Sequence, residues 1–309
     1  MRRLRFRLAL LSAFLLPTCS PSVTSLAGSQ PRAEADSARL MRLAGALAHD
    51  SMQGRGAGTP GGAMARRLLV HELTATGVAP LGGSFEHPFE YSHSGSTTAA
   101  VNVIGVIRGT QWPDRYIVAT AHYDHVGVRD GVVYNGADDN ASGTAALLEL
   151  AGWFSRNPPQ HSIVIAALDA EEAGLRGARA FIAEKPVPLG AVVADINMDM
   201  VGRNADNQLY AVGTRQNPWL KHYVEGAARG ATITVRFGHD GGVAGEQDWT
   251  WMSDQGPFLQ AGIPFLYFGV EDHPDYHRPT DDVERLQPRF FAGAAALVIE
   301  TVRRLDLDR

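Results

Sequence analysis

Residues 144–170, TAALLELAGWFSRNPPQHSIVIAALDA, decide the fold class of this chain. The spacing of apolar residues in the first half predicts a helix over 144–156, and the short apolar run HSIVIAALDA predicts a strand over 161–170. Upstream, DRYIVATAHYD predicts another strand over 114–124. Short, continuously apolar strands are buried on both faces, so this strand–helix–strand order predicts parallel strands covered by helices.

The same alternation extends along the chain in both directions. Further helices are predicted over 34–49, 61–77, 175–185, 217–230 and 288–306, and further strands over 98–109, 191–200 and 263–269. The fold class is therefore α/β, with a mainly parallel sheet covered on both faces. No repeat, low-complexity tract or long Gly/Ser linker divides residues 34–309, and we interpret them as a single domain.

The first residues differ from the rest of the chain. MRRLRFR carries four arginines and no acid, and the apolar run LALLSAFLLP that follows has the length of the hydrophobic region of a signal peptide. A permanent transmembrane helix is the weaker interpretation, because the run is too short to span a bilayer. We predict an export leader over residues 1–28 and a periplasmic or secreted protein. Cys19 directly follows the apolar run, so a lipid anchor at Cys19 is the alternative to simple cleavage.

Composition and charge limit the classes of partner. The chain is 45% hydrophobic and 20% charged, which is ordinary for a globular protein with a core. Its formal charge of −5 becomes −9 when the four arginines of the leader are removed, and no run of basic residues exceeds a pair. The sequence therefore predicts no nucleic-acid partner. Cys19 is the single cysteine, so no disulfide is expected and stability must come from packing and bound metal.

Acids and histidines gather just after the predicted strands, where ligands bind in open α/β sheets. These candidates are His122 and Asp124 after YIVATA, Glu171 and Glu172 after IVIAALDA, Asp199 after AVVADINM, Asp138 and Asp139 in NGADDNASG, and His277 in EDHPDYHRPTDD. Imidazoles and carboxylates without thiolates suit Zn²⁺, with Co²⁺ or Mn²⁺ as substitutes. Several acids with few histidines suit two cations better than one, and a bridging carboxylate would hold them about 3.5–4 Å apart.

His122 is singled out among the 11 histidines by its neighbour Asp124. The two residues lie on the same side of an extended segment, so the carboxylate can orient the imidazole. His125 and His273 are interpreted as neighbours of the site and not as ligands.

Each candidate also has an ordinary structural explanation. Asp138 could be only a turn or cap residue, and the pair Glu171–Glu172 could be the acidic first turn of a helix. Asp199 could be a buried acid paired with Arg203. Together, these explanations would require five separate segments to bring acids and imidazoles to one rim by coincidence.

Five motifs, AHYDHVG, GADDNASG, LDAEEAGLRGARAF, INMDMVGR and YHRPTDD, occur in an order that resembles the co-catalytic metallo-aminopeptidases of peptidase family M28. LAHDSMQGRGAGTPGG also resembles the N-terminal segment of that family, so the likeness covers nearly the whole chain after the leader. It is greatest to bacterial exported members. The resemblance implies a three-layer α/β/α sandwich of the zinc-dependent exopeptidase type over residues 34–309, with a mixed, mostly parallel central sheet.

The resemblance also implies two zinc ions bound by five side chains, namely His122, Asp139, Glu172, Asp199 and His277. Asp139 would bridge the ions, with His122 and Asp199 on one ion and Glu172 and His277 on the other. Asp124 would orient His122, and Glu171 would be the general base.

The implied function is a zinc-dependent aminopeptidase, a hydrolase that releases N-terminal residues from peptides with a free N-terminus by attack of metal-activated water. One alternative is a glutaminyl-cyclase-like acyltransferase on the same fold. The other is an inactive binding protein, which would lack a ligand, whereas the ligand set here is complete. Trp249, Trp251, Tyr267 and Phe268 are candidates for lining the substrate pocket, with packing as their alternative role.

Overall fold

The computed structural model describes residues 32–308 except 94, 243–244 and 246. The leader predicted over 1–28, including Cys19, lies outside the described residues. None of the helices within the described ranges combines the length and hydrophobicity that a bilayer crossing requires.

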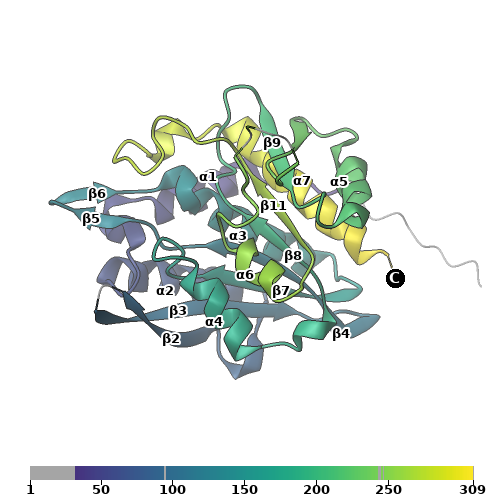
Figure 1. Ribbon diagram of the computed structural model, residues 1–309, viewed down its shortest axis with the longest axis horizontal. Coiled ribbons are helices and arrows are strands. Elements are labelled where there is room, and N and C mark those ends of the chain that lie inside the picture. The colour runs from purple at the N-terminus through teal and green to yellow at the C-terminus, as the bar shows by residue number, and fades with distance from the viewer. Residues whose placement is uncertain (1–31, 94, 243–244, 246, 309) are drawn as a thin grey trace, which may run out of the picture. The chain divides into compact units, whose positions relative to one another are not determined.

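A nine-stranded mixed sheet forms the centre of the described residues (Figure 1). Its order is β1-β3-β7-β4-β8-β11-β9-β10, and β2 also pairs with β3. The strands are β1 (Ala79–Pro80), β2 (Glu86–His93), β3 (Ser96–Ile107), β4 (Trp112–His122), β7 (His161–Leu168), β8 (Val192–Met198), β9 (Gln208–Val212), β10 (Thr234–Phe237) and β11 (Phe265–Gly269). The central strands β7, β4, β8 and β11 are parallel, as their short apolar runs predict, whereas β1, β2, β3 and β9 form antiparallel pairs at the flanks.

Helices cover both faces of this sheet. The α-helices of the described residues are α1 (Ser37–Leu47), α2 (Pro60–Ala75), α3 (Gly143–Arg156), α4 (Arg176–Glu184), α5 (Lys221–Ala228), α6 (Gln255–Gln260) and α7 (Pro288–Asp306). A separate hairpin pairs β5 (Gly127–Arg129) with β6 (Val132–Tyr134), next to a π-helical turn over Ala137–Ser142 that leads into α3.

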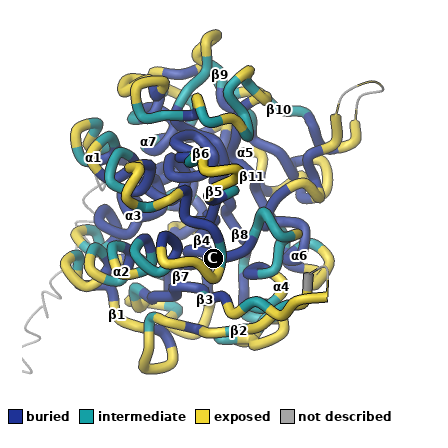
Figure 2. The backbone as a smooth tube through the Cα atoms, turned by 90° about the vertical axis from the view of Figure 1, so that its left-hand side faces the viewer, coloured by how far each residue is buried: buried dark blue, intermediate teal, exposed yellow. Residues whose placement is uncertain are grey.

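Successive side chains of β7 enter two different cores. Ile163 and Ile165 pack in the core beneath α1, α2, α3, α5 and α7, whereas Val164 and Leu168 pack in the core beneath α4 and α6. This alternation follows from the pleat of a strand, which turns neighbouring side chains to opposite faces. The result is three layers, α/β/α, with the central strands buried between helices (Figure 2), and it confirms the predicted fold class.

Two of the strands that the sequence did not predict, β2 and β10, lie at edges of the sheet. Strand β2 has the sequence EHPFEYSH, and β10 alternates between exposed and partly exposed residues. Such strands carry little apolar signal because at most one face of an edge strand is buried. The helix predicted over 217–230 is a 3₁₀ turn over Pro218–Leu220 followed by α5.

The register of the central strands brings their carboxyl ends to one edge of the sheet. In β4, His122 pairs with Leu168 of β7, and Thr120 pairs with Asn197 of β8. Met198 of β8 in turn lies opposite Phe268 of β11. The residues that follow these strands therefore meet at a single rim, as their positions in the sequence predict.

Candidate metal centre

Three predicted ligands form one group of ligating atoms at this rim. His122 ends β4, Asp139 lies in the turn before α3, and Asp199 follows β8. The Nε2 atom of His122 lies 3.3 Å from Oδ1 of Asp139 and 3.3 Å from Oδ1 of Asp199. The three side chains can therefore direct one nitrogen and two oxygen atoms at a common point.

A second group uses the other oxygen of the same aspartate. The Nε2 atom of His277 lies 3.0 Å from Oδ2 of Asp139 and 3.2 Å from Oε1 of Glu172. Asp139 thus offers one carboxylate oxygen to each group, which is the geometry of a bridging ligand between two ions. The structure brings together all five residues that the sequence analysis selected as ligands.

His125 joins the second group, although the sequence analysis interpreted it as a neighbour of the site. Its Nδ1 atom lies 2.8 Å from Oε1 of Glu172 and 3.7 Å from Oδ2 of Asp139. The ligating atoms of His125, Asp139, Glu172 and His277 all lie within 4.8 Å of one another. The signal in the sequence was the second histidine of AHYDHVG, only three residues after His122.

The donor set fits divalent cations of the zinc type. It consists of imidazole nitrogens and carboxylate oxygens, which are the ligands that Zn²⁺, Co²⁺ and Mn²⁺ accept in proteins. Among the described residues, Oε1 of Glu172 and both ring nitrogens of His125 are buried without a hydrogen-bond partner. Of these, Nδ1 of His125 and Oε1 of Glu172 face each other at 2.8 Å inside the cluster, and a bound ion would satisfy both of these atoms.

Hydrogen bonds from the surrounding loops hold Asp139 in place. The carboxylate of Asp281 accepts hydrogen bonds from the backbone N–H groups of Asp138 and Asp139, each at 3.1 Å. Asp138 accepts a hydrogen bond from the backbone of Gly202 at 2.7 Å, and its other oxygen lies 3.2 Å from Nε2 of His273. The first acid of the Asp-Asp pair therefore supports the loop, while the second reaches the centre.

Asp124 connects the two sides of the site. The backbone carbonyl of Asp124 lies 3.2 Å from Nδ1 of His122, within hydrogen-bond distance, and its carboxylate Oδ1 lies 3.6 Å from the same nitrogen. The same carboxylate also accepts hydrogen bonds from the backbone N–H groups of Glu171 at 3.0 Å and Glu172 at 3.4 Å. Asp124 therefore fixes the turn that presents both glutamates, a role that the sequence did not indicate.

Glu171 and Glu172 lie in a turn and not in a helix. Helix α4 begins at Arg176 and has no acidic residue in its first turn, which makes the alternative based on the helix dipole wrong. Glu172 points into the second group of ligands, whereas Glu171 belongs to neither group and lines the adjacent cavity. The alternative partner proposed for Asp199 is also wrong, because Arg203 pairs with Asp275 at 2.7 Å.

The environment changes the pKa values of the two glutamates in opposite directions. Burial raises the pKa of Glu171 well above its ordinary value, and the charges of Asp254 and Asp199 add to this effect. For Glu172, burial and Asp139 favour the protonated form, but contacts with the imidazoles of His125 and His277 lower its pKa to about 2. Glu172 is thus held as a carboxylate, as a metal ligand must be, while the raised pKa of Glu171 makes its carboxylate the stronger base of the two.

A buried arginine balances the acids of the centre. Arg55 is 0% exposed, and its guanidinium donates hydrogen bonds to the backbone carbonyls of Tyr123 (2.8 Å), Leu47 (2.9 Å), Asn135 (2.6 Å) and Gly136 (2.8 Å). Burial lowers its pKa to about 10, while the nearby charges of Asp139 and Asp124 oppose that change. The sequence analysis missed Arg55, because QGRGAG carries no sign that this arginine turns inward.

The cavity beside the centre contains two of the four predicted aromatic residues. It is lined by Asp139, Glu171, Asp199, Met200, Trp249, Met252, Tyr267, Val270, Asp272 and Tyr276. Trp251 is 55% exposed and is not among these residues, and Phe268 is fully buried in the core beneath α7. The prediction was therefore wrong for Phe268, because it neighbours Tyr267 on the same strand and must face the opposite side of the sheet.

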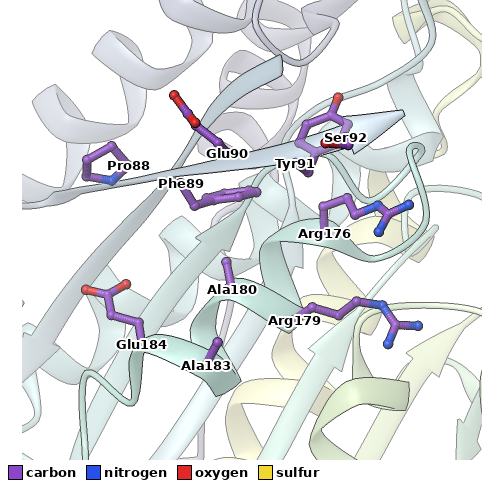
Figure 3. A pocket seen from close by; sticks show the side chains of 10 residues that line it. All are labelled: Pro88, Phe89, Glu90, Tyr91, Ser92, Arg176, Arg179, Ala180, Ala183 and Glu184. Atoms are coloured by element: carbon purple, nitrogen blue, oxygen red, sulfur yellow. The ribbon is translucent and has the colours of Figure 1, made fainter. Parts of the chain in front are cut away.

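A second cavity, of about 590 Å³, lies between strand β2 and helix α4 (Figure 3). Its lining includes Phe89 and Tyr91 from the strand and Arg176, Arg179 and Glu184 from the helix. It shares no lining residue with the cavity beside the metal centre. The acids and imidazoles that could bind metal therefore mark the smaller cavity as the place of any chemistry.

Comparison with known proteins identifies the family. Residues 102–302 match the model of Peptidase family M28. The chain belongs to peptidase family M28. All of the residues that form the two ligating groups lie within the matched range, so this membership rests on the part of the chain that contains the centre.

Individual relatives of this M28 chain carry different names. It is 32% identical over 199 residues to the probable glutamate carboxypeptidase VP8 of Zea mays, covering 58% of this chain and 26% of that protein. It is 31% identical over 214 residues to aminopeptidase YwaD of Bacillus subtilis, covering 65% of this chain and 44% of that protein. The chain thus spans less than half of the length of these curated relatives.

The fold of the M28 chain also matches solved structures. Glutaminyl cyclase from Porphyromonas gingivalis superposes with a TM-score of 0.72 at 19% identity, covering 87% of this chain and 98% of that chain. At this level of identity the likeness concerns the fold alone, and the chemistry must be argued from the site.

Proposed function

We propose that this chain is a zinc-dependent aminopeptidase that hydrolyses the first peptide bond of substrates with a free N-terminus. The observation that carries the proposal is the pair of ligating groups that share Asp139, with Glu171 outside both groups in the adjoining cavity. The name of the Bacillus subtilis relative, aminopeptidase YwaD, agrees with it. We propose two ions per chain, with His122, Asp139 and Asp199 on one and Asp139, Glu172 and His277 on the other.

Different residues of the chain transfer the proton and position the ligands. When bound, zinc ions at this centre would make water more acidic and polarise a carbonyl group. Glu171 accepts the proton of the attacking water at its carboxylate and returns that proton to the nitrogen of the leaving amine. Burial raises the pKa of Glu171, which makes its carboxylate a stronger base for the first transfer. Asp124 keeps His122 and the glutamate turn in place throughout.

The charge of the cavity favours recognition of an amino group over a carboxylate. Four of the lining residues are acids. Bound ions would neutralise Asp139 and Asp199, which leaves Glu171 and Asp272, and none of the described lining residues is basic. Binding the free carboxylate of a substrate would require an arginine, a lysine or a similar cation there. The acids instead suit the ammonium group of an N-terminus, so we propose cleavage at the amino end.

Purified protein should hydrolyse aminoacyl p-nitroanilides and lose this activity when a zinc chelator is added, with recovery when Zn²⁺ is returned. The matched control is the N-acetylated form of the same substrate, which should remain intact because it lacks the ammonium group. Release of nitroaniline measures both reactions. Formation of pyroglutamate from peptides with N-terminal glutamine, without release of amino acids, would instead identify the glutaminyl-cyclase-like alternative. Inactivity with every substrate despite full metal loading would favour a binding protein.

We also propose that residues 1–28 are an export leader and that the protein acts in the periplasm or outside the cell. The support is the arginine-rich start followed by the apolar run. N-terminal sequencing of the protein recovered from a bacterial periplasmic fraction should find the leader removed. A membrane-bound form that becomes soluble on Cys19→Ser would show acylation at that residue, and an unprocessed cytoplasmic protein would contradict the proposal.

A further inference from the structure

We propose that His125 is a metal ligand, so that one of the two ions is held by four side chains and the other by three. This inference rests on the proposed function, because it assumes the two-ion centre. The four-ligand ion would be bound by His125, Asp139, Glu172 and His277. The other ion, bound by His122, Asp139 and Asp199, would keep an open position.

Distances between the ligating atoms support this assignment. Atoms bound to zinc at about 2.0–2.1 Å in a tetrahedron lie about 3.3 Å from one another. His277, which the sequence analysis had already selected, lies 3.0 Å from Asp139 and 3.2 Å from Glu172. The corresponding distances from Nδ1 of His125 are 3.7 Å and 2.8 Å, which bracket the tetrahedral value. Both imidazoles therefore face the same two carboxylates at separations that a shared ion explains.

The hydrogen bonding of His125 supplies an independent observation. Its ring is completely buried, and among the described residues neither ring nitrogen has a hydrogen-bond partner. Oε1 of Glu172 also lacks one, although it lies only 2.8 Å from Nδ1 of His125. A buried imidazole and a buried carboxylate this close would ordinarily form a hydrogen bond. Two buried atoms that face each other at this distance without a hydrogen bond are instead what two ligands of one cation present.

The fold also holds the ring of His125 in this position. Gly136 has a φ of +56°, and a Cβ atom there would lie 2.4 Å from Cγ and Cδ2 of the His125 ring. The backbone of Gly136 therefore passes directly over the imidazole. The centroid of the His277 ring lies 5.7 Å from the centroid of the His125 ring. The imidazole is thus pre-positioned by the fold, as a ligand of a tightly bound ion should be.

The consequence is a functional difference between the two ions. Four protein ligands close a tetrahedral zinc site, and such sites are structural, whereas catalytic zinc sites keep an open position. The ion on His125 would therefore be bound tightly and would mainly fix Asp139 and Glu172. The ion on His122 and Asp199 would bind more weakly and would have the open position for water or substrate.

The test is a zinc titration of chelator-treated protein against a chromophoric competitor, with metal counted per chain. The wild-type protein should bind two ions with clearly different affinities. His125→Gln should lower the affinity of the tighter ion by at least about 100-fold, because losing a direct ligand should cost no less than losing its supporting residues. The weaker ion should keep its affinity. His87→Gln is the matched control, since His87 is also buried but pairs with Glu184 on the outside of the centre.

Two results of the titration would overturn the proposal. One is a zinc affinity of the tighter site in His125→Gln that stays within about threefold of the wild-type value. The other is an equal weakening of both sites together with reduced stability of the metal-free protein, which would show a merely structural role. Binding of fewer than two ions by the wild type would refute the two-ion centre itself, whereas an unchanged His125→Gln with two wild-type ions would refute only the role of His125.

A second measurement needs no substitution. In the cobalt-loaded wild-type protein, proton NMR should show shifted ring N–H signals from three metal-bound imidazoles, those of His122, His125 and His277. Signals from only two imidazoles would overturn the proposal even if His125→Gln failed to fold.

Discussion

Replacing Glu171 with glutamine should lower kcat by about 10²–10⁴-fold while both metal ions stay bound. Glutamine has nearly the same size and fills the same place in the cavity, but its amide cannot take up a proton. Because Glu171 belongs to neither ligating group, the metal content per chain should not change. Steady-state kinetics and elemental analysis of the same preparation measure the two quantities together.

The matched control is the same substitution one residue later. Glu172→Gln removes the charge from a ligand that lies 3.2 Å from His277 and 2.8 Å from His125, so it should weaken metal binding first and lower activity as a result. Added Zn²⁺ should therefore restore part of the activity of Glu172→Gln and none of that of Glu171→Gln. Equal loss of metal in both variants would show that the two glutamates do not divide the work as proposed.

The geometry of the turn explains how adjacent acids can have different roles. Ala170 has a φ of +57°, so the chain changes direction just before the pair. Asp124 then anchors the backbone N–H groups of both glutamates. With the backbone fixed, the two side chains leave it in different directions, one toward His277 and one into the cavity. The imidazoles of His125 and His277 next to Glu172 offset the repulsion between the two carboxylates.

The sequence located the residues of the candidate centre because each one follows a strongly patterned strand or lies in a motif with a known order. His122, Glu172 and Asp199 come from the ends of parallel strands, and parallel strands must place these ends together. Resemblance to the family then separated Asp139 from Asp138, which spacing alone left open. In the structure, Asp138 accepts a hydrogen bond from the backbone of Gly202, whereas Asp139 belongs to both candidate groups.

What the sequence could not predict depends on contacts between distant loops. The hydrogen bonds that Asp281 accepts from the Asp139 turn join residues more than 140 positions apart. The burial of His125 depends on the close approach of Gly136, which a linear pattern does not record. Arg55 is the extreme case, because a charged residue in a glycine-rich segment is ordinarily expected at the surface.

Arg55→Met should destabilise the protein by about 3–5 kcal/mol, the cost expected when one member of a buried charged arrangement is removed. Methionine fills much of the space but leaves the carbonyls of Leu47, Tyr123, Asn135 and Gly136 without their donor. It also removes the positive charge beside Asp139 and Asp124. Urea unfolding of the metal-free protein measures the loss of free energy.

Arg55→Lys separates the two contributions of this side chain. Lysine keeps the positive charge but cannot reproduce the planar fork that reaches four carbonyls at once. If charge balance dominates, the lysine variant should recover most of the lost stability, and the loss in Arg55→Met should shrink when metal ions are bound, because they supply positive charge to the same acids. If the hydrogen bonds dominate, Arg55→Met and Arg55→Lys should lose similar amounts of unfolding free energy, both with and without bound metal. We expect the second pattern, because the four bonds join the end of α1 to the segments that follow β4 and β6. A free-energy loss below about 1 kcal/mol in Arg55→Met would contradict both contributions.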